Sequence, residues 1–354
     1  MFESLKVIEL ATVLAGPAVG MFFAELGAEV IKIEHPSLPD VTRSWKLPSE
    51  NDQDPVSAYF SSVNYRKQYQ KIDLTSPEGT AEIRALIKTA DILLLNFKKG
   101  DDIKFGLTSD EILAINPQIL IGKITGFGDD SDRVAYDLIL QAESGLMSMN
   151  GTPESGPVKM PVAFIDVLAA HHLKEGLLVA LIERQISGKG REVSVSLYDA
   201  AVSSLVNQAS NYLMEGQVPQ RIGSLHPNIA PYGELFTTDD QKQVTFAIGS
   251  NRHFEGLCTF LGLPELITDE RFSANVHRVK NRTALFEILQ PVILQFASEN
   301  LNQAMLAQHI PFGIIRSLDE VFTDPVAKSL VRTEVIDGKT TKRVTSIAFK
   351  RHGN

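Results

Sequence analysis

Asp166 is the residue whose type and surroundings most directly suggest chemistry. It lies inside the apolar run PVAFIDVLAA, residues 161–170. Moving an ionised carboxylate out of water is costly unless another group pairs with it. Asp166 is therefore either the N-cap of a helix or a nucleophilic or acid–base carboxylate at the mouth of that helix. The helix is predicted by apolar residues at helical spacing, namely Leu173, Leu177, Leu178 and Leu181.

Positive side chains gather at a few places in an otherwise acidic chain. The 354 residues include 34 Lys and Arg against 43 Asp and Glu, a net charge of −9. This balance argues against a nucleic-acid partner, which would select a basic surface. The local cations indicate a small anionic ligand instead. They are Arg66, Lys67, Lys71, Lys98, Lys99 and Lys104.

Strands and helices alternate through the first half of the chain, which predicts a parallel sheet. Strand 7–10, helix 19–26 and strand 29–34 form the first unit, and Gly27 ends its helix. Helices 76–87 and 108–115 alternate with strands 92–95 and 119–124, and helix 173–186 precedes strand 192–197. The fold class is α/β, with a large Rossmann-like domain, a mostly parallel sheet and helices on both faces. Loops that leave the strand ends are candidates for ligand binding.

Several cofactor and location classes are excluded or disfavoured. Glu34 stands where a ribose-binding acid would, but the first turn reads Ala15-Gly16-Pro17 rather than Gly-x-Gly-x-x-Gly, which argues against a nicotinamide cofactor. No histidine has metal-ligand spacing, so no metal is expected. The single cysteine, Cys258, cannot form an intramolecular disulfide. Without room for a secretory signal or a membrane-spanning run, a cytoplasmic protein is expected.

The chain is predicted to contain two domains. The pattern of residue types changes after about residue 210, and residues 221–231 are rich in Gly, Ser, Pro and Asn. A hairpin over 236–248 and helices near 254–261, 282–296 and 301–309 follow. We therefore expect a large domain at 1–205 and 318–354, a linker at 206–225 and a smaller α+β domain at 226–317.

Taken together, the ordered motifs resemble the class III CoA-transferase family, also called the CaiB/BaiF family. The match covers nearly the whole chain, and its strength lies in the order and spacing of many short motifs. They are Leu14-Ala15-Gly16-Pro17, Leu26 to Glu34, Thr42-Arg43, Ala90-Asp91-Ile92, Asn96-Phe97, Gly126-Phe127-Gly128, Tyr136-Asp137, Ser144-Gly145-Leu146, Asp166, Gly188-Lys189-Gly190, His226-Pro227, Ala230-Pro231-Tyr232-Gly233 and Ile310-Pro311-Phe312-Gly313.

The resemblance implies that Asp166 is the nucleophile. Its carboxylate would attack an acyl-CoA thioester to give an acyl-aspartyl anhydride, then form an aspartyl-CoA thioester from which a carboxylic acid acceptor takes CoA. Coenzyme A is then a co-substrate, and no permanently bound cofactor is expected. Helix amides would keep Asp166 ionised. Tyr136 joins Asp166 as a catalytic candidate.

The resemblance also places CoA on the large domain. The turn Val13-Leu14-Ala15 would approach the pantetheine arm, and Lys104 would bind phosphate. Residues expected to contribute to the nucleotide site are Arg43, Ile72, Asp73, Leu74, Thr75, Asn96 and Phe97. Leu14 stands where several transferases have Gln, so an amide contact to the thioester oxygen is not expected.

Further implications concern the acceptor and the assembly. The glycine-rich loop of formyl-CoA transferases is not visible around Gly223 to Gly233, which argues against oxalate as acceptor. Family members form interlocked homodimers, and the same is expected here. The chain stops short of a C-terminal helix common in the family, so the return to the large domain after about residue 317 is expected to be abbreviated.

Two other functions are compatible with the same fold. An α-methylacyl-CoA racemase exchanges an α-proton between two bases, but the His of that branch reads Tyr136 here, and a phenol is a weak base at neutral pH. The expected partner Glu is also missing around Gly249-Ser250-Asn251. A CoA-binding protein without turnover is the second alternative, suggested by Leu14 and the short C-terminus.

Overall fold

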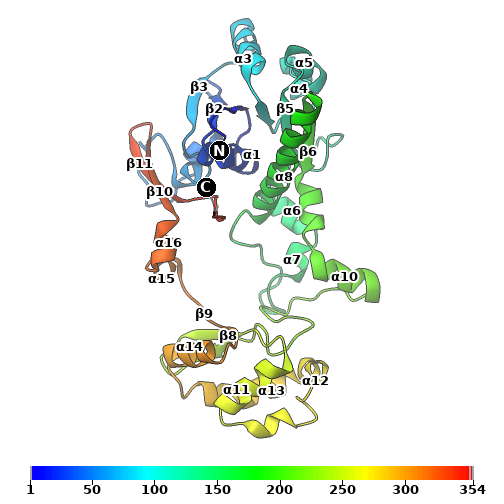
Figure 1. The fold of residues 1–354 in the computed structure, drawn as a ribbon, viewed down its shortest axis with the longest axis vertical. Helices are drawn as coiled ribbons and strands as arrows, with labels where there is room; N and C mark the ends of the chain where they lie inside the picture. Colours follow the sequence, from blue (N-terminus) through cyan, green and yellow to red (C-terminus); the bar gives the residue numbers. More distant parts are fainter. Residues whose placement is uncertain (1, 351, 353–354) are drawn as a thin grey trace. The chain divides into compact units, whose positions relative to one another are not determined.

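The computed structural model describes residues 2–350 and 352, and the chain divides into two compact units (Figure 1). The large unit contains the described residues up to 149, residues 158–219 and the described residues from 329 onwards. The small unit contains residues 150–157 and 220–328. Among the described residues, no helix is long and apolar enough to cross a membrane.

A six-stranded parallel sheet forms the centre of the large unit, which confirms the predicted fold class. Its order is β3-β2-β1-β4-β5-β6. The carboxyl ends of its strands therefore lie along one edge, where open α/β sheets bind ligands. The strands are β1 (Lys6–Glu9), β2 (Glu29–Glu34), β3 (Gln68–Lys71), β4 (Ile92–Leu95), β5 (Leu120–Thr125) and β6 (Arg191–Ser196).

Alternating side chains of the strands bury both faces of this sheet. Val7 and Leu94 pack in the cluster that includes α1 (Ala15–Glu25) and α8 (Phe164–Ser187). Ile8 and Leu93 face the opposite way, into the cluster that includes α3 (Pro77–Thr89) and α5 (Ser109–Ile115). Shorter helices of the unit are η1 (Val41–Ser44), α2 (Ala58–Ser61), α4 (Asp101–Phe105), α6 (Asp137–Glu143), α7 (Leu146–Met149), α9 (Leu197–Ser203) and α10 (Val206–Glu215). Helix α10 occupies part of the segment that was expected to be a linker.

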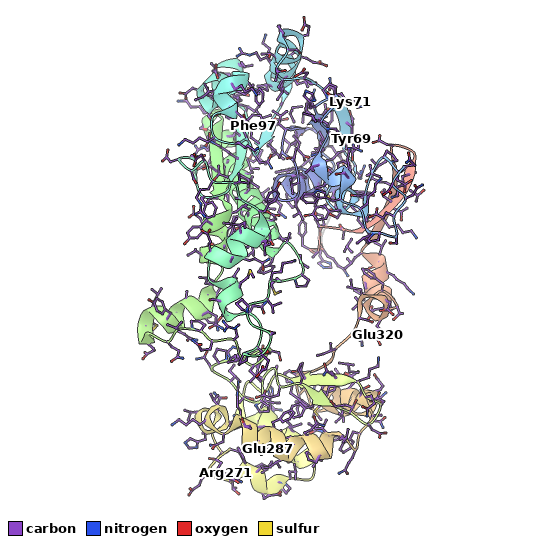
Figure 2. All side chains as sticks on the ribbon, turned by 180° about the vertical axis from the view of Figure 1, so that it is seen from behind. Tyr69, Lys71, Phe97, Arg271, Glu287 and Glu320 are labelled. Carbon is purple, nitrogen blue, oxygen red and sulfur yellow. The ribbon has the colours of Figure 1, made fainter. Side chains whose placement is uncertain are left out.

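An antiparallel hairpin near the C-terminus packs against the 43–67 region of the large unit. It consists of β10 (Val331–Ile336) and β11 (Lys339–Val344). Asp337 in its turn lies 2.9 Å from Arg43, and Lys339 lies 2.8 Å from Asp54. Arg343 pairs with Glu25 of α1. The last part of the chain thus braces loops near its beginning. Figure 2 shows Tyr69 and Lys71 on the sheet-edge strand β3.

The small unit is an α+β structure with its own apolar core. Its antiparallel sheet has the order β7-β8-β9. Glu320 of α15 pairs with Lys242. Figure 2 labels Glu320 together with Arg271 and Glu287. The elements are β7 (Phe236–Thr237), β8 (Gln243–Phe246), α11 (Asn251–Phe260), η2 (Pro264–Ile267), α12 (Asn275–Lys280), α13 (Arg282–Ile293), α14 (Ser298–Ala307), β9 (Phe312–Ile314), α15 (Leu318–Val321) and α16 (Pro325–Ser329).

Candidate functional site

Asp166 lies in the first turn of α8 rather than at its N-cap. The helix begins at Phe164 and its N-cap is Ala163, so the N-cap interpretation of Asp166 is wrong by three positions. The apolar run that precedes the leucines already belongs to the helix from Phe164 onwards, and no residue in that run marks where the helix begins. The Asp166 side chain is only 8% exposed. It therefore lies at a helix start without serving as its cap.

The cap of α8 comes from Asp137, at the first position of α6. One oxygen of its carboxylate accepts the backbone N–H of Ile165 at 2.8 Å, and the other accepts the side-chain amide of Gln141 at 2.6 Å. The Gln141 oxygen in turn accepts the N–H of Met160 at 2.8 Å. Asp137 and Gln141 thus fix the segment that leads into Asp166, and they bring a second carboxylate near it.

The Asp166 carboxylate receives no hydrogen bond from any residue in the described part of the chain. Burial, followed by the negative charge of Asp137, raises the pKa of Asp166 to about 7. The raised pKa contradicts the expectation that helix amides keep Asp166 ionised, and the Ile165 N–H in the first turn of α8 is bound to Asp137 instead. A carboxylate of this kind can act as a nucleophile when ionised or as an acid when protonated near neutral pH.

Aromatic side chains from three segments gather near these carboxylates. Trp45 follows η1, Tyr59 lies in α2 and Tyr136 precedes α6. The Trp45 ring centroid is 5.1 Å from that of Tyr59 and 6.5 Å from that of Tyr136. Burial, followed by the negative charges of Asp166 and Asp137, raises the pKa of Tyr59 to about 12. Tyr59 therefore stays a neutral phenol beside Asp166.

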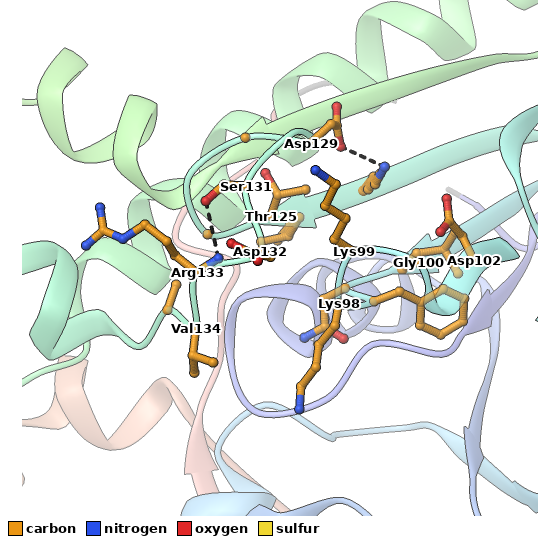
Figure 3. Close-up of a pocket in the computed structure, with 18 of the residues that line it drawn as sticks. Lys98, Lys99, Gly100, Asp102, Thr125, Asp129, Ser131, Asp132, Arg133 and Val134 are labelled. Atoms are coloured by element: carbon orange, nitrogen blue, oxygen red, sulfur yellow. Dashed lines mark hydrogen bonds and ion pairs between the residues drawn. The ribbon is translucent and has the colours of Figure 1, made fainter. Parts of the chain in front are cut away.

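A cavity of about 480 Å³ opens at the carboxyl edge of the sheet, where β1, β4 and β5 end (Figure 3). Its lining includes Val13, Asn96, Phe97 and Tyr136 of the predicted CoA-binding and catalytic residues, and Lys98 and Lys99 of the predicted cation group. Asp166 does not belong to the described lining. Tyr136 belongs both to the lining and to the aromatic group, so it connects the cavity with the neighbourhood of Asp166.

The lysines that line the cavity differ in whether their side chains already have a hydrogen-bond or ion-pair partner. Lys123 lies 2.6 Å from Asp129, and Lys99 donates to the carbonyl oxygen of Asp130 at 2.6 Å. The Lys98 side chain has no hydrogen bond or ion pair with any residue that the structure describes, and Figure 3 shows it extending away from Lys99. Lys98 is therefore the cavity lysine that is most available to an anionic ligand.

The other predicted CoA-binding residues lie outside this lining or are already engaged. Arg43 makes a two-pronged contact with Glu34 at 2.7 and 2.8 Å and also pairs with Asp337. Lys104 lies on α4, with its ammonium 5.1 Å from the ring centroid of Phe105, and it does not line the cavity. Leu14 and Ala15 adjoin Val13 as the N-cap and first residue of α1.

The segment after β3 has its own local structure. Ile72 is buried, and the Asp73 carboxylate accepts the backbone N–H and the hydroxyl of Thr75. The nearby His35 ring lies 3.5 Å from Asp73. Leu74 packs against the apolar cluster that contains Ile72. None of the residues 72–75 belongs to the described cavity lining.

Sequence reasoning missed Asp137, Trp45 and Tyr59 as functional candidates, and it named Lys98 only as one member of a group of clustered cations. Asp137 was visible next to Tyr136 in the Tyr136-Asp137 motif, and Trp45 is the only tryptophan of the chain. Neither feature predicts a partner, because the contacts that define their roles join segments far apart in sequence. Lys98 was one of several clustered lysines, and only its place in the cavity separates it from Lys104.

Comparisons with known proteins agree on the family. The pattern of CoA-transferase family III matches residues 2–352. The chain is 37% identical over 329 residues to a succinate–glutarate CoA-transferase of Agrobacterium fabrum, covering 91% of this chain and 82% of that protein. It is 33% identical to the succinyl-CoA:glutarate CoA-transferase of Homo sapiens, covering 91% and 73% of the two chains. A crystal structure of a CaiB/BaiF family protein from Brucella suis matches with a TM-score of 0.84 and 37% identity, over 98% and 92% of the two chains.

Proposed function

Since this chain belongs to CoA-transferase family III and is an enzyme of that class, we propose that Asp166 transfers CoA from an acyl-CoA thioester to a carboxylic acid. The Asp166 carboxylate attacks the thioester carbonyl, the C–S bond breaks, and an acyl-aspartyl anhydride and CoA thiolate form. The thiolate attacks the aspartyl carbonyl and releases the first acid. The acceptor carboxylate then attacks the aspartyl thioester, and the freed thiolate takes the acceptor acyl group, which restores Asp166.

The observation that carries this proposal is a buried carboxylate to which no described group donates a hydrogen bond. Asp166 is 8% exposed, and its pKa is raised to about 7. At neutral pH a substantial fraction of Asp166 is ionised, and no protein hydrogen bond has to break before its oxygen attacks. Apolar neighbours such as Ile165 keep water away from the anhydride.

We place CoA in the cavity at the carboxyl edge of the sheet. Val13 and the adjoining Leu14 and Ala15 would contact the pantetheine arm, and Phe97 would contact the adenine. Lys98 offers an unpaired charge for a phosphate group, as a point charge rather than a fork. Tyr136 lines this cavity and lies near Trp45 in the aromatic group, so the thioester end of CoA would extend from the cavity past Tyr136 toward Asp166.

The acceptor is proposed to be a short dicarboxylic acid. The relatives from Agrobacterium fabrum and Homo sapiens are named for succinate or succinyl-CoA and glutarate. Both acids carry one carboxylate that can receive CoA and a second that remains charged. We therefore expect succinyl-CoA to be a donor and glutarate an acceptor.

The test combines turnover with trapping of the intermediate. The protein is incubated with succinyl-CoA and glutarate, and glutaryl-CoA is measured by mass spectrometry. Hydroxylamine added with acyl-CoA alone should convert Asp166 to a hydroxamate, found on the peptide that contains residue 166. Asp166→Asn, which has nearly the same shape, should give neither product. Loss of optical activity from a chiral 2-methylacyl-CoA, without any CoA exchange, would contradict the proposal and favour a racemase.

We also propose that two copies assemble as the interlocked homodimer expected of the family. Exposed apolar side chains support an interface on helix α8, where Val179, Ile182 and Ile186 lie on one face. Helix α10 exposes Leu213 and Met214. Light scattering should give twice the mass of the 38.9 kDa chain, and a monomer at micromolar concentration would contradict the assembly.

A further inference from the structure

The turn that joins β1 to α1 is held by buried side chains from other parts of the large unit. Lys32 donates to the carbonyl oxygen of Ala11 at 2.7 Å, and Lys67 donates to that of Pro17 at 2.9 Å. The Asn96 side chain accepts the N–H of Thr12 and donates to its carbonyl oxygen, at 3.0 and 2.9 Å. The start of the turn, its middle and the first turn of α1 are therefore each held by side chains from other parts of the chain.

Val13, at the tip of this turn, has a backbone conformation that a valine rarely adopts. Its φ is +72°, in the left-handed region that disfavours β-branched residues. Its N–H points at the carboxylate of Asp40, with distances of 3.2 and 3.4 Å to the two oxygens. A strained residue persists only where the surrounding structure determines its conformation. Asp40 holds the Val13 N–H itself, next to the contacts that fix Thr12 and Ala11.

Asp40 is itself fixed by a buried ionic network. Its carboxylate accepts the N–H and hydroxyl of Thr42 at 3.0 and 2.7 Å and lies 3.0 Å from Lys32. Lys32 also contacts Glu9 at 3.1 Å, and Lys67 lies 2.8 Å from the same carboxylate. The four charged side chains of this group are all fully buried. Two acids face two amines, so each buried carboxylate of the network has an amine partner.

The surrounding packing leaves little freedom for the turn to move. A Cβ on Gly16 would lie 2.3 Å from the side chain of Ala11, and one on Gly20 would lie 1.9 Å from the Glu9 carboxylate. Helix α1 can approach the buried acid this closely only because these positions are glycines. The carboxylate of Glu9 thus touches α1 as well as both lysines.

We propose that Asp40 is a positioning residue for CoA binding, which acts by holding Val13 in its left-handed conformation at the wall of the cavity. Thr12 and Val13 both line that cavity, whereas Asp40 is outside the described lining. The inference rests on the proposed placement of the pantetheine arm beside Val13. Release of Val13 would let the peptide before Leu14 rotate and change the wall that the arm contacts, while Asp166 and its cap from Asp137 would remain in place.

The test separates binding of acyl-CoA from binding of the acceptor acid. In Asp40→Ala, Val13 loses its acceptor, so the KM for acyl-CoA should rise about tenfold while the KM for the acid changes less than twofold. Adding Val13→Gly should lower the KM of that variant about fivefold, because glycine adopts positive φ without strain. Val13→Gly alone supplies the baseline and should show no such gain. A merely destabilised protein would instead lose active fraction, with unchanged KM values and no rescue.

Two further variants keep the outcome decisive. Asp40→Asn retains an acceptor for Val13 and should keep the KM for acyl-CoA within about threefold of wild type, although its melting temperature falls. Should Asp40→Ala not fold, Thr42→Val removes the hydroxyl that orients Asp40 and should raise this KM about threefold, reversed by Val13→Gly. Wild-type KM values in folded Asp40→Ala or Thr42→Val, or no rescue by glycine, would overturn the inference. Absence of CoA transfer by the wild-type protein would instead overturn the proposed function.

Discussion

Asp40 and Asp166 are two carboxylates of the large unit that are almost equally buried, at 3% and 8% exposure. They differ in what surrounds them. Asp40 accepts hydrogen bonds from Val13 and Thr42 and pairs with Lys32. Asp166 has no such donor among the described residues. Burial alone therefore does not separate a structural carboxylate from a reactive one, whereas the number of satisfied oxygens does.

The two environments move the carboxyl pKa values in opposite directions. Burial raises the pKa of Asp40, but the attraction of Lys32 and the bonds from Thr42 outweigh it, so the pKa is lowered. At Asp166 burial acts without any compensation, and the charge of Asp137 adds to it. The contacts from Lys32 and Thr42 favour an ionised Asp40, whereas Asp166, the proposed nucleophile, is left costly to ionise.

The largest expected effect separates Asp166 from Asp40 in catalysis. Asp166→Asn removes the proposed nucleophile, so kcat for CoA transfer should fall by at least roughly 10⁴-fold. The measurement is the steady-state rate with succinyl-CoA and glutarate. Asp40→Asn is the matched control and should retain at least a tenth of the wild-type kcat. Equal losses in the two variants would break the distinction between the carboxylates.

Stability should show the reverse order. Glu9→Gln leaves Lys32 and Lys67 without their shared buried counter-charge, so the free energy of unfolding should fall by about 3–5 kcal/mol. Urea unfolding followed by circular dichroism measures this. Asp166→Asn breaks no hydrogen bond in the described part of the chain, and it should not destabilise the protein at pH 8. A larger loss in Asp166→Asn than in Glu9→Gln would contradict the assignment of structural and reactive roles.

The pH dependence of stability sharpens the same distinction. Because the folded-state pKa of Asp166 is raised from 3.8 to about 7, the folded state holds an extra proton between these values, and this group lowers the free energy of unfolding as pH rises through that window. Asp166→Asn removes this dependence. Its stability relative to wild type should therefore improve between pH 5 and pH 8, by at most about 3 kcal/mol. A constant difference across that range would show that the Asp166 pKa is not raised.

Asp137 should tune the reactive carboxylate through its charge. Asp137→Asn keeps an oxygen for the N–H of Ile165 but removes the negative charge that raises the pKa of Asp166. The acid limb of the kcat/KM profile, expected near pH 7 in the wild type, should move to lower pH in the variant. An unchanged limb would mean that burial alone sets the pKa.

The smallest predicted effect extends the contrast to cations. Lys32 is saturated by Glu9, Asp40 and a carbonyl oxygen, whereas Lys98 lines the cavity without a partner in the described chain. Lys98→Ala should raise the KM for acyl-CoA about fivefold, more so at low ionic strength. Lys104→Ala, six residues away and outside the cavity lining, should change it less than twofold. The opposite ranking would restore Lys104 as the phosphate-binding residue.

The parts of the fold that depend on local pattern could be predicted from the sequence. Strands such as β4 are short apolar runs, and α3 begins at the Ser76-Pro77 signal, so both were found close to their true limits. The start of α8 was misplaced because apolar residues precede Asp166 as well as follow it. The parallel sheet followed from the alternation of these elements.

The sequence could predict a site residue only where the residue's type and its immediate neighbours indicate a function without any distant contact. Asp166 stands out in an apolar run. That its carboxylate receives no hydrogen bond from the described residues could not be predicted, since it depends on Asp137, which accepts the N–H of Ile165 at the start of the helix. The role of Asp40 depends on Val13, 27 residues earlier, and on the charge of Lys32. Arg43 looked like a ligand-binding cation, and its engagement by Asp337 joins residues 294 positions apart. Such contacts leave no trace in local spacing.

The hairpin β10–β11 also places a limit on how the protein is made. Arg43 meets Asp337 only after a further 294 residues have been added, which takes roughly 15–60 s at about 5–20 residues per second. During synthesis, the loop that carries Trp45 therefore emerges from the ribosome long before the strands that brace it. The contact between Arg43 and Asp337 therefore forms late in synthesis, so the nascent large unit has to remain free of aggregation through that interval without this brace.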